Sequence, residues 1–386
     1  MSISIRPLSI SDAEEWRGLC REAFGSSTLQ GDIEASFGRP GQTVWGVFNR
    51  SGMIATASEL DFQSWFGGSA LATSGIAAVT VRAEHRGQGL LRQLMREISE
   101  VARIRGALLT SLFPTSTTVY RRYGYEVIAE LLTVRFPTHE LASAGTYSSA
   151  RRAHHSDAAQ ISAVYDRWAR QQNGPLTRVG AAFPAGSNPL NRPGFQVTVV
   201  DRDDGSIGGY AIWRCPSNFG VDSVLEIDEF VADDRESVLA LAAALGSFSA
   251  VAPIAQLRTS GMDVVRLILQ SSQWEVLQSV PYMLAVLDPQ VLGHLTFPSG
   301  MSVALNYSVA EVQNRLEVNS GAGVCTQAET SSGRVLTLGG LALTLAGAQS
   351  SANLRSLDFL SGGDLSSDLQ WDALFCRRQV HIRDHF

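Results

Sequence analysis

Residues 79–91, VTVRAEHRGQGLL, place a basic side chain and two glycines between a buried strand and a helix. The apolar run IAAVTV predicts the strand, and the spacing of apolar residues that follows predicts an amphipathic helix ending near Gly106. Backbone N–H groups at a helix N-terminus bind phosphate groups, helped by the helix dipole. Gly87 and Gly89 would let the backbone approach a phosphate closely, and Arg86 could donate two hydrogen bonds to it. This stretch therefore predicts a pyrophosphate-binding turn.

A glycine-rich turn alone is often only a helix cap. Here it lies between a buried strand and a helix, and the motif YRRYGY, residues 120–125, follows about thirty residues later. The combination favours a ligand-binding turn over a cap.

The chain ends on an aromatic residue, with no polar tail after it. In residues 379–386, QVHIRDHF, apolar Val380 and Ile382 alternate with polar residues, which predicts a half-buried strand that runs to Phe386. Chain ends are usually frayed unless something holds them. Two explanations stay open: Phe386 only packs the terminus in place, or its carboxylate is positioned for chemistry.

Composition limits the classes of protein that fit. The length of 386 residues predicts two or three domains, and 45% hydrophobic with 18% charged residues indicates an ordered protein. A net charge of −6 weighs against nucleic acid and mildly favours cationic ligands. The N-terminus has no signal-peptide pattern, and the longest apolar run, LGGLALTLAG from Leu338, is shorter than the ~18 residues of a membrane helix. The four scattered cysteines have no metal-ligand spacing, so we expect no metal site, no membrane contact and a reduced cytoplasm.

Two successive segments repeat an order of strands and helices. Residues 1–140 contain the glycine-rich turn, and residues 150–288 repeat the order without such a turn between the last strand and helix. Residues 138–150 have the small and polar composition of a linker. Residues 289–386 form a third segment, expected to continue as hairpin-like strands. The pattern predicts an α/β (α+β) fold class.

The turn Arg86-Gly87-Gln88-Gly89-Leu90-Leu91 resembles the acetyl-CoA loop of GCN5-related N-acetyltransferases (GNAT). The stretches VTVRAEHRGQGLL, VYRRYGYEV and VYDRWARQQNGPLTR, with the aromatic C-terminus, resemble more narrowly the Eis (enhanced intracellular survival) family. The resemblance covers the whole chain in order and is strongest in residues 75–125. It implies tandem GNAT-like domains, residues 1–140 and 150–288, followed by a sterol-carrier-protein-like α/β domain, residues 289–386.

The resemblance also implies a site for acetyl-CoA. The backbone of Val79 and Val81 would pair with the pantetheine arm, and the pyrophosphate would lie on Arg86, Gly87, Gln88, Gly89, Leu90 and Leu91. Gly87 and Gln88 stand where the family often has basic residues, which would weaken phosphate binding. Thr115 falls near the expected thioester. Phe24 and Ser26 fall where the family lines its amine pocket.

By the same resemblance, Tyr120 would be the general acid and the C-terminal carboxylate of Phe386 the general base. A cationic amine must lose a proton before its nitrogen can attack a thioester, and a terminal carboxylate, with a reference pKa of ~3.5, is ionised at pH 7. A tyrosine hydroxyl, with a reference pKa of ~10, suits protonation of a leaving thiolate. Tyr123 and Tyr125 are expected to pack in the core. The terminal histidines, His381 and His385, are expected to be bystanders.

The leading hypothesis is an acetyl-CoA-dependent N-acetyltransferase that acts on small cationic amines, aminoglycoside-like or polyamine-like. Acetylation of protein lysines is an alternative, as is a non-catalytic CoA- or lipid-binding protein in which the third segment binds the ligand. The resemblance also implies a hexamer. All 31 basic residues are arginine. Codon bias in a GC-rich genome explains this, and so would an advantage in lacking amines that activated acyl groups modify.

Overall fold

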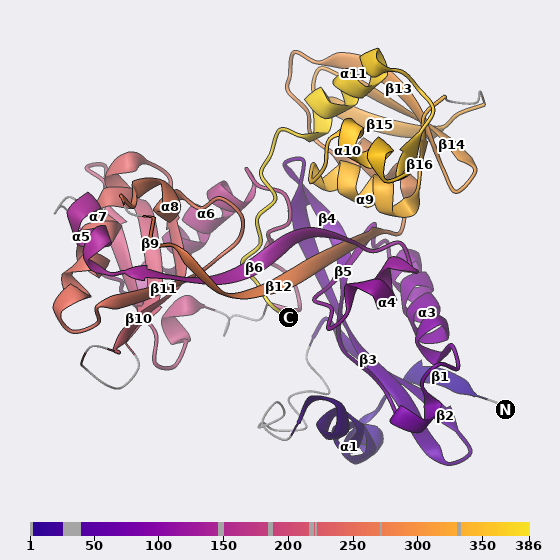
Figure 1. Ribbon diagram of the computed structural model, residues 1–386, viewed down its shortest axis with the longest axis horizontal. Coiled ribbons are helices and arrows are strands. Elements are labelled where there is room, and N and C mark those ends of the chain that lie inside the picture. The colour runs from indigo at the N-terminus through magenta and orange to yellow at the C-terminus, as the bar shows by residue number, and fades with distance from the viewer. Residues whose placement is uncertain are drawn as a thin grey trace.

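The computed structural model describes residues 3–25, 40–145, 150–183, 188–215, 220, 222–270, 272–329 and 333–386. Two β-sheets with helices packed on them make up this part of the chain (Figure 1). The α/β fold class predicted from the sequence is therefore confirmed.

The large sheet has twelve strands in the described residues. In order across the sheet they are β1 (Ser4–Pro7), β2 (Gln42–Asn49), β3 (Gly52–Phe66), β4 (Ser69–Val81), β5 (Leu109–Leu112), β12 (Glu275–Val286), β6 (Glu126–Pro137), β11 (Ile254–Thr259), β10 (Val224–Ala232), β9 (Ile207–Arg214), β8 (Gln196–Asp201) and β7 (Ala150–Arg152). The small sheet has the order β15 (Ala322–Gln327), β14 (Val312–Asn319), β13 (Ser302–Val309), β16 (Val335–Leu336) and β17 (Leu360–Ser361).

Helices pack on these sheets in three groups. The first unit, β1–β6, carries α1 (Ala13–Phe24), α3 (Leu90–Ile104) and α4 (Thr117–Arg121). The second unit, β7–β11, carries α5 (His139–Ala144), α6 (Ala158–Ala169), α7 (Arg235–Gly246) and α8 (Val264–Ile268). The third unit, β13–β17, carries α9 (Leu338–Ala346), α10 (Ser351–Ser356) and α11 (Leu365–Phe375).

Two long strands, β6 and β12, join the first and second units into one sheet (Figure 1). The carboxyl end of β12 pairs with β5, from Met283↔Leu112 to Val286↔Leu109. β12 also runs along β6, which continues into the second unit and pairs there with β11. A strand that follows the second unit in the sequence thus lies inside the sheet of the first. The division into domains at residues 140, 150 and 288 stays a prediction.

α3 is held by one apolar face, so its first turn has a fixed place at the end of β4. Its buried residues recur every three or four positions, which puts them on one side of the helix: Leu90, Leu94, Met95, Ile98 and Ala102. Leu90, Leu94, Met95 and Ile98 pack in one core cluster with residues of β2, β3 and β12.

The predicted linker is wrong for residues 139–144, which form α5. Leu141 is buried in the core of the second unit, and α5 packs against α7. The two helices approach so closely that a Cβ on Gly246 would lie 2.1 Å from the backbone nitrogen of Ala142. The small residues that resemble a linker are therefore the residues that this helix contact requires.

The prediction of hairpin-like strands up to the C-terminus is also wrong, because residues 338–375 contain α9, α10 and α11. The apolar run from Leu338 forms α9, which is buried over most of its surface and therefore shows no one-sided pattern. No helix in the described ranges is both long and apolar enough to cross a membrane.

The last residues run as an extended segment between the first and second units, not as a strand (Figure 1). Val380 forms an isolated parallel bridge with Asn173. His381, Ile382 and Arg383 are all buried, which contradicts the expected alternation. The reason is that Ile382 packs into the core that includes the third unit, whereas Arg383 bonds to the second. We call residues 379–386 the C-terminal segment.

The contact between α5 and α7 gives a test of stability. We expect Gly246→Ala to lower the free energy of unfolding by about 1–3 kcal/mol, because its methyl group would overlap the backbone of α5. Gly18→Ala, in α1, is the matched control, since a Cβ there meets no atom within 4 Å. It should raise stability by up to about 1 kcal/mol through helix propensity. Urea unfolding measures both, and equal effects would contradict the packing argument.

Candidate functional site

The predicted phosphate turn leads from β4 into α3. Gly87 and Gly89 have φ of +76° and +75°, the left-handed region that favours glycine. A Cβ at either position would meet no atom within 4 Å, so backbone conformation, not a close neighbour, requires glycine there. Gly89 is the N-cap of α3. The N–H groups of Leu90 and Leu91 thus lie in the first turn, where helices have no internal acceptors.

The side chains of the turn divide into two groups. Leu90 is buried and Leu91 packs partly against the same core, so these two residues offer only their backbone N–H groups to a ligand. Arg86 Nε donates to the carbonyl oxygen of Val81 at 3.2 Å, and Gln88 donates to the carbonyl oxygen of Glu84 at 3.3 Å. These bonds hold both side chains at the turn. The exposed turn, with its arginine, fits a pyrophosphate.

The edge of β4 next to this turn is open in the described structure. β5 pairs in parallel with β4 only as far as Ile76↔Leu112. On its other edge β4 stays paired with β3, but with a register shift opposite Thr56 and Ser58. Ala78 lies in this bulge and has a φ of +49°, unusual for a residue with a Cβ. The separation of β4 from β5 leaves room for an extended arm to add along Val79 and Val81 like a strand.

Tyr120 lies in α4, beyond the end of β5. Its side chain is buried, and burial raises the pKa of its hydroxyl to about 12. The hydroxyl therefore keeps its proton at neutral pH. The hydroxyl of the neighbouring Tyr125 shares a 2.8 Å hydrogen bond with Thr110, so that tyrosine is engaged inside the core. Thr115 is exposed in the loop between β5 and α4.

A cavity of about 460 Å³ lies between α1, the bulged strands and the C-terminal segment. Its lining joins the two sides of the bulge to the last three residues of the chain: Trp16, Gln42, Ser58, Leu60, Phe62, Ala77, Ala78, Leu176, Ala182, Phe183, Asp384, His385 and Phe386. Within the described residues this lining contains an acidic side chain, Asp384, and no arginine. We call it the terminal cavity.

The Phe386 ring is held by aromatic residues of the first unit. Its centroid lies 4.9 Å from that of Phe62 and 5.5 Å from that of Phe113, both in edge-on arrangements. A Cβ on Gly75 would come within 2.8 Å of the ring, so this glycine makes room for it. The last residue of the chain is thus packed against β3 and β4 near the bulge.

Phe24 and Ser26, which the resemblance implies as residues of the amine pocket, are not among the described residues that line the terminal cavity. Phe24 packs beside Trp16 in the small core under α1 and does not line the terminal cavity. Ser26 lies outside the described residues. His385, expected to be a bystander, lines the cavity and stacks on Phe113 at 4.4 Å, and burial lowers its pKa. No periodicity in the sequence indicated this position.

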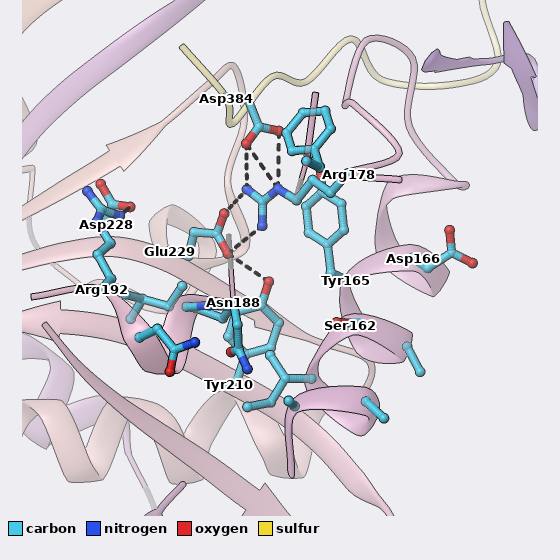
Figure 2. Close-up of a pocket in the computed structure, with 18 of the residues that line it drawn as sticks. Ser162, Tyr165, Asp166, Arg178, Asn188, Arg192, Tyr210, Asp228, Glu229 and Asp384 are labelled. Carbon is cyan, nitrogen blue, oxygen red and sulfur yellow. Dashed lines mark hydrogen bonds and ion pairs between the residues drawn. The ribbon is translucent and has the colours of Figure 1, made fainter. Parts of the chain in front are cut away.

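A larger cavity, about 820 Å³, lies in the second unit, and Phe183 and Asp384 line both cavities. Figure 2 shows Arg178 between the carboxylates of Asp384 and Glu229. Arg178 Nε donates to Asp384 at 3.0 Å, and the guanidinium lies 3.9 Å above the Tyr165 ring.

The sequence did not predict that Arg178, Glu229 and Asp384 would form a cluster. Burial alone would raise the pKa of Glu229, but Arg178 lowers it to about 2. The ion pair is therefore charged over the physiological range. The one available signal was that Tyr165 and Arg178 belong to the stretch VYDRWARQQNGPLTR, whereas their partner Asp384 lies far away in the sequence. No group of histidine, cysteine and acidic side chains suited to a metal ion occurs in the described ranges.

Comparison with known proteins identifies the domain that carries the turn. Residues 4–128 match the family model described as an acetyltransferase (GNAT) domain. An uncharacterized N-acetyltransferase of Streptomyces avermitilis is 27% identical over 128 residues, 32% of this chain and 30% of that protein. Another from the same organism is 30% identical over 146 residues, 36% and 34% of the two chains. The chain thus matches about a third of the length of these curated relatives. Acetyltransferases of this class take the acetyl group from acetyl-CoA.

Two solved structures share the fold over the whole chain. A GCN5-related N-acetyltransferase from Kribbella flavida has a TM-score of 0.85 at 24% identity, and Eis1 from Mycobacterium abscessus has 0.77 at 18%. Each likeness covers 100% of both chains. At these identities the likeness shows the fold alone, which is the predicted arrangement of tandem GNAT-like units with a further α/β unit.

The phosphate turn gives a binding test. We expect one acetyl-CoA per chain, and Gly89→Asp should weaken its affinity by ~100-fold or more, because a carboxylate would face the pyrophosphate. Gly106→Asp is the control: Gly106 also has a positive φ and open surroundings, but it follows the C-terminus of α3, about 22 Å away. The affinity of the Gly106→Asp variant for acetyl-CoA should stay within about twofold of wild type. Calorimetric titration decides, and an unchanged Gly89→Asp affinity would place the pyrophosphate elsewhere.

Proposed function

We propose that the chain is an acetyl-CoA-dependent N-acetyltransferase of the Eis type, which acetylates amines of small cationic molecules, aminoglycoside-like or polyamine-like. The observation that carries the proposal is the terminal cavity, whose wall joins the bulge of β4 to the last residue of the chain. An acceptor in this cavity would lie beside the open edge of β4, where the acetyl donor fits.

Acetyl-CoA would supply the activated acetyl group. Its pyrophosphate would be bound by the first-turn N–H groups of α3, with Arg86 and the two glycines of the turn. Its pantetheine arm would pair with the backbone of Val79 and Val81 along the edge that β5 leaves open.

The residues of this chain would then move two protons. The carboxylate of Phe386, ionised at neutral pH, would hold the cationic amine and accept a proton from its nitrogen. The hydroxyl of Tyr120 would donate a proton to the leaving group, and it carries that proton at neutral pH because its pKa lies well above 7. His385 is the competing base because it lines the same cavity. The proposal favours Phe386, because a carboxylate also attracts the cation, which a neutral imidazole does not.

The substrate class follows from charge. Phe386, which carries the terminal carboxylate, lines the terminal cavity together with Asp384, whose charge is offset by its pair with Arg178. No arginine is among the described lining residues. Such a cavity favours a cationic molecule over an acidic one. A hexameric assembly is proposed from the resemblance alone, and a cytoplasmic location from the scattered cysteines.

The position of the terminal carboxylate is testable by one added residue. A glycine appended after Phe386 leaves the aromatic ring in place but moves the carboxylate by about 3.3 Å. A displacement of 1 Å at a reacting centre can cost about 100-fold in rate. We therefore expect the extended chain to lose acetyl transfer to an amine panel while its acetyl-CoA affinity and melting temperature stay near those of wild type.

Deletion of Phe386 is the companion variant. It should also abolish turnover, but with a loss of stability, because the ring packs against Phe62 and Phe113. Near-normal transfer by the glycine-extended chain would mean that the terminus only packs, and His385 would then become the leading candidate for the base.

A further inference from the structure

The second unit repeats the strand separation that the first unit presents to acetyl-CoA. β10 and β11 pair in parallel as far as Ile227↔Leu257, just as β4 and β5 pair as far as Ile76↔Leu112. A bulge follows immediately on β10, as it does on β4. A short helix follows each of the inner strands, α4 after β5 and α8 after β11. The second unit therefore repeats, between β10 and β11, the separation of β4 from β5. We call the separation of β4 from β5 the donor cleft and that of β10 from β11 the second cleft.

The turn that leads from β10 into α7 does not suit a pyrophosphate. Its N-cap is Asp234, whose carboxylate accepts the backbone N–H of Ser237 at 2.8 Å. Asp233 adds a second carboxylate, paired with Arg167 at 2.6 Å. Counted from the N-cap, Asp234 stands where the first unit has Gly89, and Asp233 where it has Gln88. The second cleft thus lacks the glycine turn that the donor cleft has.

The C-terminal segment places a guanidinium in this cleft. Arg383, which is 2% exposed, donates to the carbonyl oxygen of Phe230 in β10 at 3.3 Å. It also donates to the carbonyl oxygen of Arg258 in β11 at 3.0 Å. The two acceptors come from the two strands that separate. Arg383 thus bonds to main-chain groups of both walls, at the level where an added strand would pair in the first unit.

A buried carboxylate fixes this guanidinium. Asp263, the N-cap of α8, lies 3.0 Å from Arg383 and accepts a 2.5 Å bond from Thr259 and a 2.9 Å bond from the backbone N–H of Val265. Burial alone would raise the pKa of Asp263, but Arg383 and His381 lower it well below its usual range. The pair is therefore ionised, and both terminal nitrogens of the Arg383 guanidinium are bonded, which makes the pair a strong anchor.

We propose that the second unit's degenerate cofactor cleft is the docking site of the C-terminal segment, and that Arg383 is a positioning residue for the terminal carboxylate. Three extended residues, at most about 10 Å, separate Arg383 from the end of the chain. The bonds of Arg383 therefore limit where the carboxylate of Phe386 can lie. The pair between Asp384 and Arg178 adds a second fixed point in the same segment. This role rests on the proposed function, but the docking itself does not.

The test compares Arg383→Met with a control, Arg377→Met. Arg377 is exposed and lies just before the C-terminal segment. Arg383→Met should increase amide hydrogen exchange in residues 381–386 and lower kcat for the amine by ~100-fold, as a misplaced reacting group does. The KM for acetyl-CoA should stay within about twofold. Arg377→Met should leave all three unchanged, and Arg383→Lys should recover part of kcat because an ammonium can still bond to the same acceptors.

A second variant guards against misfolding. Asp263→Asn combined with Arg383→Met removes both charges, so no buried carboxylate is left unpaired. It should retain the melting temperature of the wild type better than Arg383→Met and still show the released segment and the loss of kcat. A segment that stays protected in both variants would overturn the docking, and a released segment with normal kcat would overturn the positioning role. If wild-type protein transferred no acetyl group, the proposed function would fail while the exchange data still decided the docking.

Discussion

The side chain of Asn173 joins the parts of the molecule that form the site. Its Oδ1 accepts the backbone N–H of Gly67, in the turn between β3 and β4, at 2.8 Å. Its Nδ2 donates to the carbonyl oxygen of Ala346 in α9 at 2.9 Å. Its main chain accepts from His381 and donates to Gln379, each at 2.9 Å. One buried residue thus links the first and third units through its side-chain amide and the C-terminal segment through its main chain.

An amide is suited to this position because it offers both a donor and an acceptor. A carboxylate would lack the donor, and an apolar side chain would leave the part-buried N–H of Gly67 and the buried carbonyl of Ala346 without this partner. An unpaired buried group costs about 1–3 kcal/mol. The path of the C-terminal segment from the third unit to the terminal cavity depends on this joint. The position of Phe386, and with it the proposed base, follows from that path.

Two similar units can divide the work of one site. The first has a glycine turn and an open edge of β4, which suit acetyl-CoA. The second has an acidic turn, and its corresponding cleft contains Arg383. In the proposed account one cleft binds the donor and the other fixes the chain end that meets the acceptor. β6 and β12 connect the two units because both strands run through the shared sheet.

The sequence predicted the features that depend on local pattern. The turn at Gly87 and Gly89 and the helix after it follow from glycine's backbone freedom and a repeat of apolar residues within one helix. The C-terminal segment was predicted as a strand because alternation was read without the neighbours that cover it on several sides. The pair between Arg178 and Asp384 joins residues 206 positions apart, a distance across which periodicity carries no information. The α5 contact looked like a linker for a related reason, since small residues serve both loops and close helix packing.

The most direct test is the distance from the terminal carboxylate to a bound amine. A crystal structure of the chain with CoA and a cationic amine would measure it. The account predicts the amine nitrogen in the terminal cavity, within hydrogen-bond reach, about 2.6–3.2 Å, of a carboxylate oxygen of Phe386. An amine bound elsewhere, or bound in this cavity with its nitrogen directed at His385 and away from that carboxylate, would contradict it.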